Sequence, residues 1–251
     1  MLTSQRKKLI LEKLAQEGQV LAKQLSEMFG LSEDTIRRDL RELDSEGLLQ
    51  RVHGGALPVS SAIAPFAERN TLESAAKRAI AGAAAAMILP GQVAIVDGGT
   101  TSAALVKQLP ASLHATIVTH SPSVAVDLVE HPNIEVILIG GRLFKHSIVS
   151  VGAAAVEAMS HIRADIYFMG VTGVHPTAGL STGDLEEAYI KRALAARAAE
   201  TVVLASAAKL NAASQYAIGD VTLAQTIIVE HATDDALIAP LQQAGVSVIK
   251  A

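Results

Sequence analysis

Short apolar runs with almost no charge recur along the chain after residue 90, and helix-length segments separate most of them. The first run is QVAIVD at residues 92–97 and the last is VSVIK at residues 246–250. A strand that is apolar at every position is buried on both faces, and alternation with helices implies parallel pairing. The pattern therefore predicts an α/β domain with a mostly parallel sheet. The other predicted strands are residues 116–119, 134–141, 165–170, 201–206 and 226–230, and the predicted helices are residues 73–89, 100–109, 122–130, 151–160 and 184–199.

The composition supports a packed protein and excludes several classes of function. Half of the residues are hydrophobic and 18% are charged, which is ample for a core. No apolar run reaches the roughly 18 uncharged residues of a membrane span, and the N-terminus lacks the apolar core of a signal peptide. There is no cysteine, and the histidines show no metal-ligand spacing. We expect a cytoplasmic protein with no membrane segment, no metal and no cofactor.

Charge divides the chain into two modules. Residues 1–57 hold nine Lys or Arg and nine Asp or Glu, so this segment is neutral and the remainder carries the whole net charge of −4. The stretch LPVSSAIAPFAERN, with two prolines and no clear periodicity, follows the neutral segment. We predict a first domain at residues 1–57, a linker at 58–75 and a second domain at 76–251.

The first module contains three predicted helices followed by a short hairpin. Residues 6–18 and 21–30 have helical spacing and end at glycines, and Ser32 caps a third helix that ends at Gly47. On this third helix Ile36, Leu40 and Leu43 share one apolar stripe, which turns Asp34, Arg38 and Arg41 to the opposite face. Two helices joined by a short turn, with an exposed basic face on the second, are typical of a helix-turn-helix.

The residue types on that face suit DNA. An arginine fork can bind guanine or a phosphate through two hydrogen bonds, and Ser32 and Thr35 stand at the helix start, where hydroxyls can hold a phosphate. The alternative is an ordinary solvated face, since Asp34–Arg38 and Arg38–Glu42 both have the i,i+4 spacing of internal ion pairs. The spacing alone leaves both interpretations open.

The stretch DGGTTSAALVKQL is the next informative one. A predicted strand ends at Asp97, and the following glycines and Thr100-Thr101 open a helix, an arrangement that favours an anion such as phosphate. A plain strand-to-helix turn is the alternative, because neither a Walker A loop nor a dinucleotide fingerprint is present. Other strands of the predicted sheet are also followed by polar or glycine-rich residues, at the sheet edge where ligands bind. These are residues 119–121, 140–142 and 170–173, and Lys209. We expect a small anionic ligand there.

Both modules resemble the DeoR family of bacterial transcription regulators. The first module carries the family's recognition helix and wing, and the second carries family motifs from Asp97 to Lys209. The matching residues are Ser32, Thr35, Ile36, Arg37, Arg38, Asp39, Leu40, Arg51, His53, Gly54, Gly55 and Ala56, then Asp97, Gly99, Thr100, Thr101, Thr119, Ser121, Gly140, Gly141, Asp165, Phe168, Gly170, Glu186, Glu187 and Lys209. Two positions depart from the pattern, with His120 in place of the usual Asn and Ser206 where Asp is frequent.

The resemblance implies a winged helix-turn-helix joined to an effector domain that is related to ribose 5-phosphate isomerase and senses a phosphorylated sugar. Asp39 is expected to be a structural partner within its helix. We therefore predict a regulator, a repressor of carbohydrate-metabolism genes, that binds operator DNA and forms a homo-oligomer. The predicted DNA-binding residues are Ser32, Thr35, Arg37, Arg38, Arg41, Arg51 and His53. The predicted effector-binding residues are Asp97, Gly99, Thr100, Thr101, His120, Ser121, Gly141, Arg142 and Lys209.

Two other functions remain open from the sequence. A sugar-phosphate isomerase with an appended DNA-binding head would use acid and base groups chosen from Asp97, Asp165, Glu187, Lys191 and Lys209. The isomerase motif Asp-Gly-Ala-Asp-Glu is absent, however, because the corresponding strand ends DIYFMGVTGV. A regulator whose second domain only oligomerises is the other alternative. We expect no enzyme activity.

Overall fold

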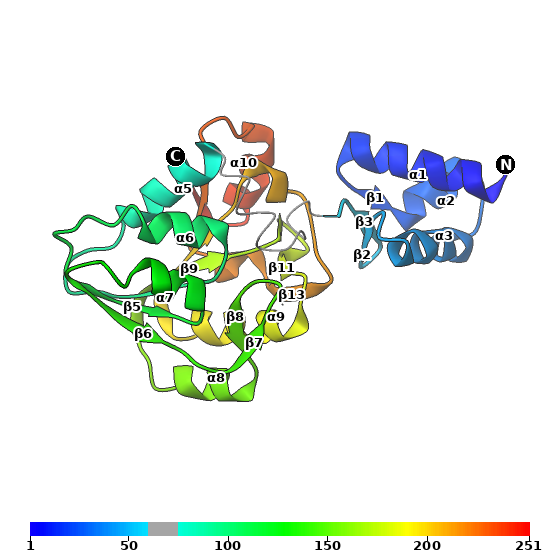
Figure 1. The fold of residues 1–251 in the computed structure, drawn as a ribbon. Helices are drawn as coiled ribbons and strands as arrows, with labels where there is room; N and C mark the ends of the chain where they lie inside the picture. Colours follow the sequence, from blue (N-terminus) through cyan, green and yellow to red (C-terminus); the bar gives the residue numbers. More distant parts are fainter. Residues whose placement is uncertain (60–74) are drawn as a thin grey trace.

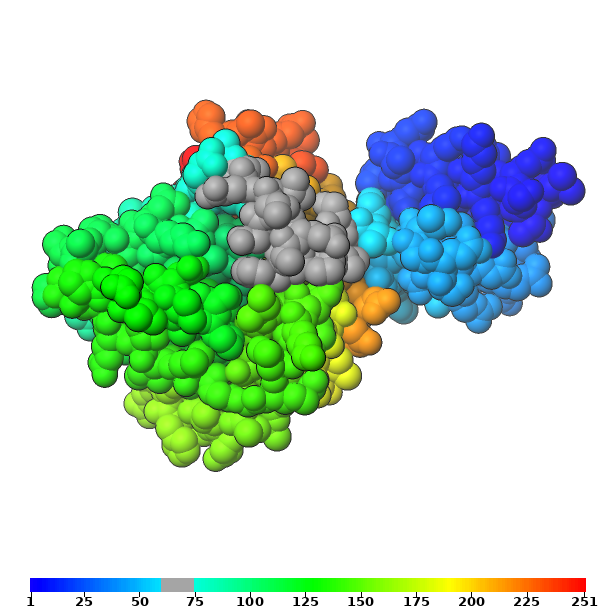
Figure 2. Space-filling view, viewed as in Figure 1, coloured from blue at the N-terminus to red at the C-terminus, as the bar shows by residue number. Residues whose placement is uncertain are grey.

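The structure, a computed structural model, describes residues 1–59 and 75–251. The two modules form separate lobes, with the N-terminal lobe beside the larger one (Figures 1 and 2). The predicted linker at residues 58–75 falls mainly on residues 60–74, which lie outside the described residues. Among the described residues, every helix is too short or too polar to span a bilayer.

The N-terminal lobe is the predicted winged helix-turn-helix. Ile36, Leu40 and Leu43 are buried as the apolar stripe requires, and they pack with Ile10 and Leu25 of the first two helices. The first strand pairs with the third, which pairs with the second, to give a small antiparallel sheet. The elements are α1 (Thr3–Glu17), β1 (Val20–Leu21), α2 (Ala22–Phe29), α3 (Glu33–Ser45), β2 (Gln50–Val52) and β3 (Gly55–Leu57).

The glycine pair of the wing has two separate structural roles. Gly54 has a φ of 82°, a left-handed conformation that only glycine adopts without strain, and it makes the turn between β2 and β3. At Gly55 a Cβ would lie 1.9 Å from the carbonyl oxygen of Val20, so a side chain there would push β1 away from β3. Both glycines are therefore needed for the wing to close on the helices.

The larger domain is built on a seven-stranded sheet in which every neighbouring pair is parallel, as predicted. The strand order is β15-β14-β12-β9-β4-β5-β6. Its strands are β4 (Val93–Val96), β5 (Ala115–Thr119), β6 (Ile134–Leu138), β9 (Ala164–Gly170), β12 (Ala198–Leu204), β14 (Thr226–Val229) and β15 (Ser247–Lys250).

Helices cover both faces of this sheet and divide the core in two (Figure 1). Residues alternate between the two cores along β9, where Ile166 and Phe168 lie in one, and Tyr167 and Met169 in the other. The helices are α5 (Ala75–Ala85), α6 (Thr100–Val106), α7 (Pro122–Asp127), α8 (Ala153–Met159), α9 (Leu185–Ala195) and α10 (Asp235–Gln243).

The predicted helices at residues 73–89, 100–109 and 122–130 end earlier than expected, at Ala85, Val106 and Asp127, and a fourth runs into a strand. The helix expected at residues 184–199 ends at Ala195, and β12 begins three residues later at Ala198. The sequence AARAAE has high helix propensity, but Ala198 and Glu200 pair with β9 in the central sheet. Tertiary pairing therefore overrides local propensity here. In the same way Val151, expected to start a helix, is the last residue of a strand.

Two small sheets and one helix were not predicted from the sequence. A hairpin is formed by β7 (Arg142–Phe144) and β8 (Val149–Val151), and a second sheet contains β10 (Gly173–His175), β11 (Gly179–Thr182) and β13 (Tyr216–Gly219). These strands are three or four residues long, which is too short to give a periodic signal. The missed helix, α10, contains Pro240, which interrupts its helical pattern.

Candidate functional site

The predicted DNA-binding residues lie together on the N-terminal lobe. Ser32 caps α3 by accepting a hydrogen bond from the backbone N–H of Thr35, and its hydroxyl lies 3.0 Å from the Thr35 hydroxyl. Arg37, Arg38 and Arg41 are exposed on α3, as are the acidic Asp34 and Glu42. Arg51 and His53 are exposed on the wing. The helix and the wing thus present their basic residues to solvent.

The internal ion pairs of α3 differ from those expected. Arg37, not Arg38, pairs within the helix, at 2.8 Å from Glu33 and 3.9 Å from Asp34. Within residues 1–59 and 75–251, neither Arg38 nor Arg41 forms an ion pair. The expected pairs Asp34–Arg38 and Arg38–Glu42 are therefore wrong, because Glu42 pairs with Lys7 of α1 instead. Two arginines on the exposed face keep their charge available for a phosphate or a base.

Asp39 holds the recognition helix in place from the buried side. Its carboxylate accepts two hydrogen bonds from the Arg6 guanidinium, at 2.5 and 2.9 Å, and it has no exposed surface. The partner was expected within α3, but it belongs to α1. These two parallel hydrogen bonds between one guanidinium and one carboxylate fix the rotation of α3 about its axis relative to α1. They therefore also fix the direction in which Arg38 and Arg41 point.

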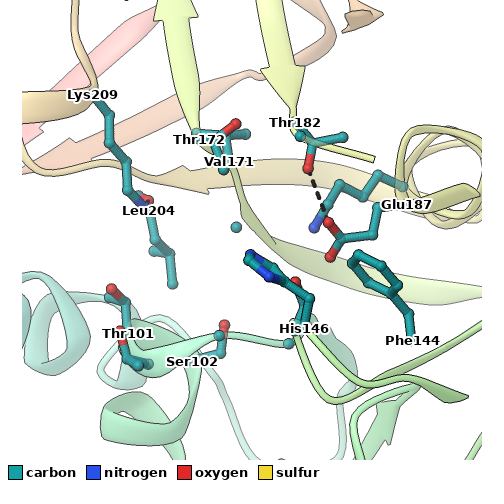
Figure 3. Close-up of a pocket in the computed structure, with 17 residues that line it drawn as sticks. Thr101, Ser102, Phe144, His146, Val171, Thr172, Thr182, Glu187, Leu204 and Lys209 are labelled. Atoms are coloured by element: carbon teal, nitrogen blue, oxygen red, sulfur yellow. Dashed lines mark hydrogen bonds between the residues drawn. The ribbon is translucent and has the colours of Figure 1, made fainter. Parts of the chain in front are cut away.

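A cavity of about 170 Å³ opens in the larger domain at the carboxyl ends of β4, β9 and β12 (Figure 3). Four of the predicted effector-binding residues line it: Gly99, Thr100, Thr101 and Lys209. The other lining residues are Gly98, Ser102, Phe144, His146, Ser147, Gly170, Val171, Thr172, Thr182, Gly183, Glu187, Lys191 and Leu204. The cavity is small and is lined by hydroxyl, carboxylate and ammonium groups together with apolar side chains.

Asp97 lies beneath the cavity and does not line it. Its two oxygens bind Lys191 Nζ at 2.5 Å and His120 Nε2 at 2.6 Å, and they also accept from Tyr167 Oη and Gly170 N. Burial alone would raise the pKa of Asp97, but the Lys191 ammonium and the His120 hydrogen bond outweigh it and hold the pKa below its ordinary value. The carboxylate is charged and its acceptor sites are used within the protein.

His120 and Ser121 also support the site from below. The His120 ring has one nitrogen on Asp97 and the other 2.9 Å from the carbonyl oxygen of Ser150. Ser121 Oγ donates to the carbonyl of Ile148, and both side chains are fully buried. These contacts account for both polar groups, so neither lines the cavity. They anchor the β7–β8 hairpin to the sheet.

Gly141 and Arg142 are not brought into the cavity. Both are exposed, and Arg142 is the first residue of β7. The strand β6 ends at Leu138, and the chain then turns into the hairpin rather than over the sheet edge. The later part of the hairpin reaches the cavity instead, through Phe144, His146 and Ser147, with the Phe144 and His146 rings 5.7 Å apart.

Several lining residues were not among the predicted effector-binding residues. Ser102 is the residue after the predicted Thr100-Thr101 pair, and Glu187 and Lys191 lie four apart on α9, spacing that places them on one face. That spacing was a usable signal, although the sequence favoured both residues only as acid and base groups of an isomerase. Among the described residues, Ser102 Oγ is the one buried side-chain polar atom without a hydrogen-bond partner. A ligand atom is the natural partner for this hydroxyl.

A second cavity lies between the two lobes. The wing contributes Arg51 and His53, and the β10-β11-β13 sheet contributes His175 and Ser181. Ser181 and the cavity-lining Thr182 are neighbours on β11, and they point to opposite faces of that strand. A single strand therefore borders both the candidate effector site and the space beside the wing.

Two of the five acid and base groups proposed for an isomerase, Asp97 and Asp165, do not line the cavity. Asp165 lies near the start of β9, where its carboxylate accepts from Val93 N, whereas the cavity lies at the other end of that strand. Asp97 is fully engaged by the protein. Three of the five candidates, Glu187, Lys191 and Lys209, line the cavity.

Comparison with known proteins identifies both modules. Residues 6–62 match the DeoR-like helix-turn-helix domain, and residues 72–231 match the DeoR C-terminal sensor domain. The chain is 33% identical to the HTH-type transcriptional regulator GlpR of Haloferax volcanii, over 99% of this chain and 98% of that protein. It is 32% identical to a putative aga operon transcriptional repressor of Escherichia coli O157:H7, over 98% of this chain and 93% of that protein.

A third relative, the glycerol-3-phosphate regulon repressor of Escherichia coli K12, is 31% identical over 89% of each chain. These relatives are named as regulators and none as an enzyme, which removes the isomerase alternative. The winged lobe, the exposed arginines of α3 and the matched sensor domain agree with one another. The chain belongs to the DeoR family and is a DNA-binding transcription regulator.

Proposed function

We propose that the protein is a repressor whose operator binding is controlled by a phosphorylated sugar or polyol in the α/β cavity. The observation that carries the proposal is the unpartnered Ser102 hydroxyl, which is 1% exposed and lines that cavity. Lys209 and Thr101 line the same side of the cavity (Figure 3). A buried hydroxyl without a partner costs about 1–3 kcal/mol, and a phosphate oxygen would relieve that cost.

The DNA-binding part of the proposal rests on the exposed face of α3 and on the wing. Arg38 and Arg41 are the arginines best placed to contact operator bases or phosphates, because the Arg37 charge is paired with Glu33. Ser32 and Thr35 stand at the start of α3, where their hydroxyls can approach a phosphate. Arg51 and His53 extend the same contact from the wing.

The regulatory step is a shift between two arrangements of the DNA-binding lobes. An effector changes operator affinity only by the difference in its own affinity for those two arrangements. We propose that a homo-oligomer supplies paired lobes for repeated half-sites in the cytoplasm, because a module with no net charge has weak general attraction to DNA. A complex mass equal to the operator DNA plus one chain, measured by light scattering, would contradict this assembly.

The test is fluorescence anisotropy on a labelled DNA fragment that flanks the protein's own gene. We expect tight, salt-dependent binding that one monophosphorylated sugar or polyol weakens. Binding that no phosphorylated compound alters would contradict the sensor assignment and would leave the operator assignment standing.

Ser102→Ala provides the matched variant for this test. The change removes an unpartnered hydroxyl, so the unliganded protein should unfold at the same temperature or a higher one. The effector that alters operator binding should bind about fivefold more weakly, the equivalent of one hydrogen bond. An unchanged effector affinity would show that the ligand does not reach Ser102.

A further inference from the structure

The cavity has two ends of different chemistry (Figure 3). Lys209 lies with Thr101 and Ser102 at one end. Glu187 lies with Thr182 and Phe144 at the other, and His146 points into the space between. A ligand that places its phosphate beside Lys209 would present its remaining groups to Glu187.

The Glu187 carboxylate is held rigidly and keeps acceptor capacity for a ligand. The side chain is 7% exposed, and its Oε2 accepts a hydrogen bond from Thr182 Oγ1 at 3.1 Å. Its backbone N–H donates to Asp184, the N-cap of α9, which fixes the start of the helix. Across the described parts of the chain, no group donates a hydrogen bond to Oε1.

Lys191 does not neutralise this carboxylate. Its ammonium lies one helical turn away but binds Asp97, which has no exposed surface. Lys191 and Asp97 together contribute no net charge. The other lysine of the cavity, Lys209, lies at the opposite end (Figure 3). The negative charge of Glu187 therefore remains local, and the adjacent Phe144 ring limits the water that could screen it.

We infer that Glu187 determines effector specificity by accepting hydrogen bonds from hydroxyl groups and by excluding ligands with a second anionic group at that end. The inference rests on the proposed function, because it assumes that the phosphate binds beside Lys209. Hydroxyls can donate to Oε1, whereas a phosphate or carboxylate placed there would face a like charge in a partly buried site. The protein would then respond to monophosphorylated polyols and reject their bisphosphorylated and acidic forms.

The experiment is isothermal titration calorimetry on the full-length protein with matched ligands. The probes are inorganic phosphate, glycerol 3-phosphate, ribose 5-phosphate and fructose 6-phosphate. Fructose 1,6-bisphosphate and 6-phosphogluconate supply the second anionic group. The wild-type protein should bind at least one monophosphate, and a doubly anionic ligand at least about tenfold more weakly.

Glu187→Gln keeps an acceptor for Thr182 and removes the charge. This variant should bind the doubly anionic ligands at least about tenfold more tightly than the wild-type protein does, with a much smaller change for the monophosphate. Glu186→Gln is the control, since Glu186 lies on the same helix, is half-buried and does not line the cavity. It should change neither affinity, and melting curves of both variants verify folding.

Each outcome has a distinct meaning. If the wild-type protein binds a monophosphate and its doubly anionic counterpart equally well, Glu187 does not exclude a second anionic group. The inference is then overturned, and the proposed function stands. If Glu187→Gln weakens all ligands in the same proportion, the carboxylate is only structural. If no monophosphate binds the wild-type protein or changes its operator binding, the proposed function fails and the inference fails with it.

Discussion

Each domain buries one carboxylate against one cation, and the two pairs differ in what surrounds them. In the DNA-binding lobe Asp39 meets Arg6 through two parallel hydrogen bonds and lines neither of the two cavities described above. In the sensor domain Asp97 meets Lys191, His120, Tyr167 and a backbone N–H directly beneath a cavity that Lys191 also lines. The first pair sets the orientation of a helix. The second sets both the packing and the electrostatics of a binding site.

The largest effect should come from breaking the simpler pair. Asp39→Ala leaves the Arg6 charge buried without a partner, which costs about 3 kcal/mol. A core of this size seldom supplies more than about 3–5 kcal/mol in total, so the lobe should unfold and operator binding should be lost. Anisotropy measures the binding, and calorimetry should show that the transition of the sensor domain is retained.

Glu46→Ala is the control for this change. Glu46 pairs with Lys7, so it also connects the end of α3 to α1, but its side chain is half exposed. This substitution should leave operator affinity nearly unchanged. If Asp39→Ala and Glu46→Ala lowered operator affinity equally, the buried and the exposed ion pair would contribute equally to DNA binding.

The second effect tests the sensor pair. Asp97→Asn leaves Lys191 buried without an anion and should lower the free energy of unfolding of the sensor domain by about 3 kcal/mol in urea titrations. Operator binding should persist at low temperature, while the effector response is lost. Asp127→Asn, which breaks the surface pair with Lys107, should do neither. A stable Asp97→Asn protein with a normal effector response would show that this pair sets neither the packing nor the electrostatics of the binding site.

A smaller effect on operator binding should distinguish the arginines on the surface of α3 from one another. Arg38→Ala should weaken operator binding about tenfold to a hundredfold, the effect of removing one specific arginine contact. Arg37→Ala should lower operator affinity by a smaller factor, because Glu33 already pairs with the Arg37 guanidinium. Anisotropy at several salt concentrations checks both variants. The reverse order of effects would mean that Arg37 leaves Glu33 to bind DNA.

The smallest effect concerns pH and the sensor domain. Burial lowers the pKa of His175, whose Nδ1 accepts hydrogen bonds from the backbone N–H groups of Thr177 and Ala178. The unfolded chain takes up a proton near pH 6.5, whereas the folded chain does so only at lower pH. Stability should therefore fall as pH drops below about 6.5, by at most about 1.4 kcal/mol per pH unit.

His175→Asn keeps an acceptor at this position and removes the titration. Urea unfolding of this variant should depend less on pH between about 7 and 5 than that of the wild-type protein. Identical pH dependence in the two proteins would assign the acid sensitivity to other groups.

The sequence predicted the parts of the fold and of the cavity that follow from a repeating pattern. It did not predict contacts that depend on a single residue. Parallel strands and the stripe of Ile36 and Leu40 are periodic, so the fold class could be predicted from them. The glycines and threonines after β4 could be placed at the cavity for the same reason, because a strand end locates them. Phe144 and Thr182 could not, since they arrive on short strands whose pairing depends on distant residues.

His120 and Ser121 show a different limit. Both follow β5 at the sheet edge where ligands bind, and position alone favours contact with an effector. Their side chains instead hydrogen-bond to Asp97 and to the β7–β8 hairpin. Whether a polar residue faces a ligand or supports a neighbour depends on its rotamer and on its partners, and neither is encoded in the spacing.

The strand β11 has a mechanical consequence. Thr182 borders the effector cavity and Ser181 borders the space beside the wing, so one peptide unit spans the distance between the two sites. The Ser181 hydroxyl accepts from Ser214 N, and its carbonyl oxygen accepts from the hydroxyl of Thr172, which also lines the effector cavity. A β-strand cannot shift by one residue without turning every side chain over. A ligand that displaces Thr182 would therefore be expected to move Ser181 with it, because the two residues share one peptide unit.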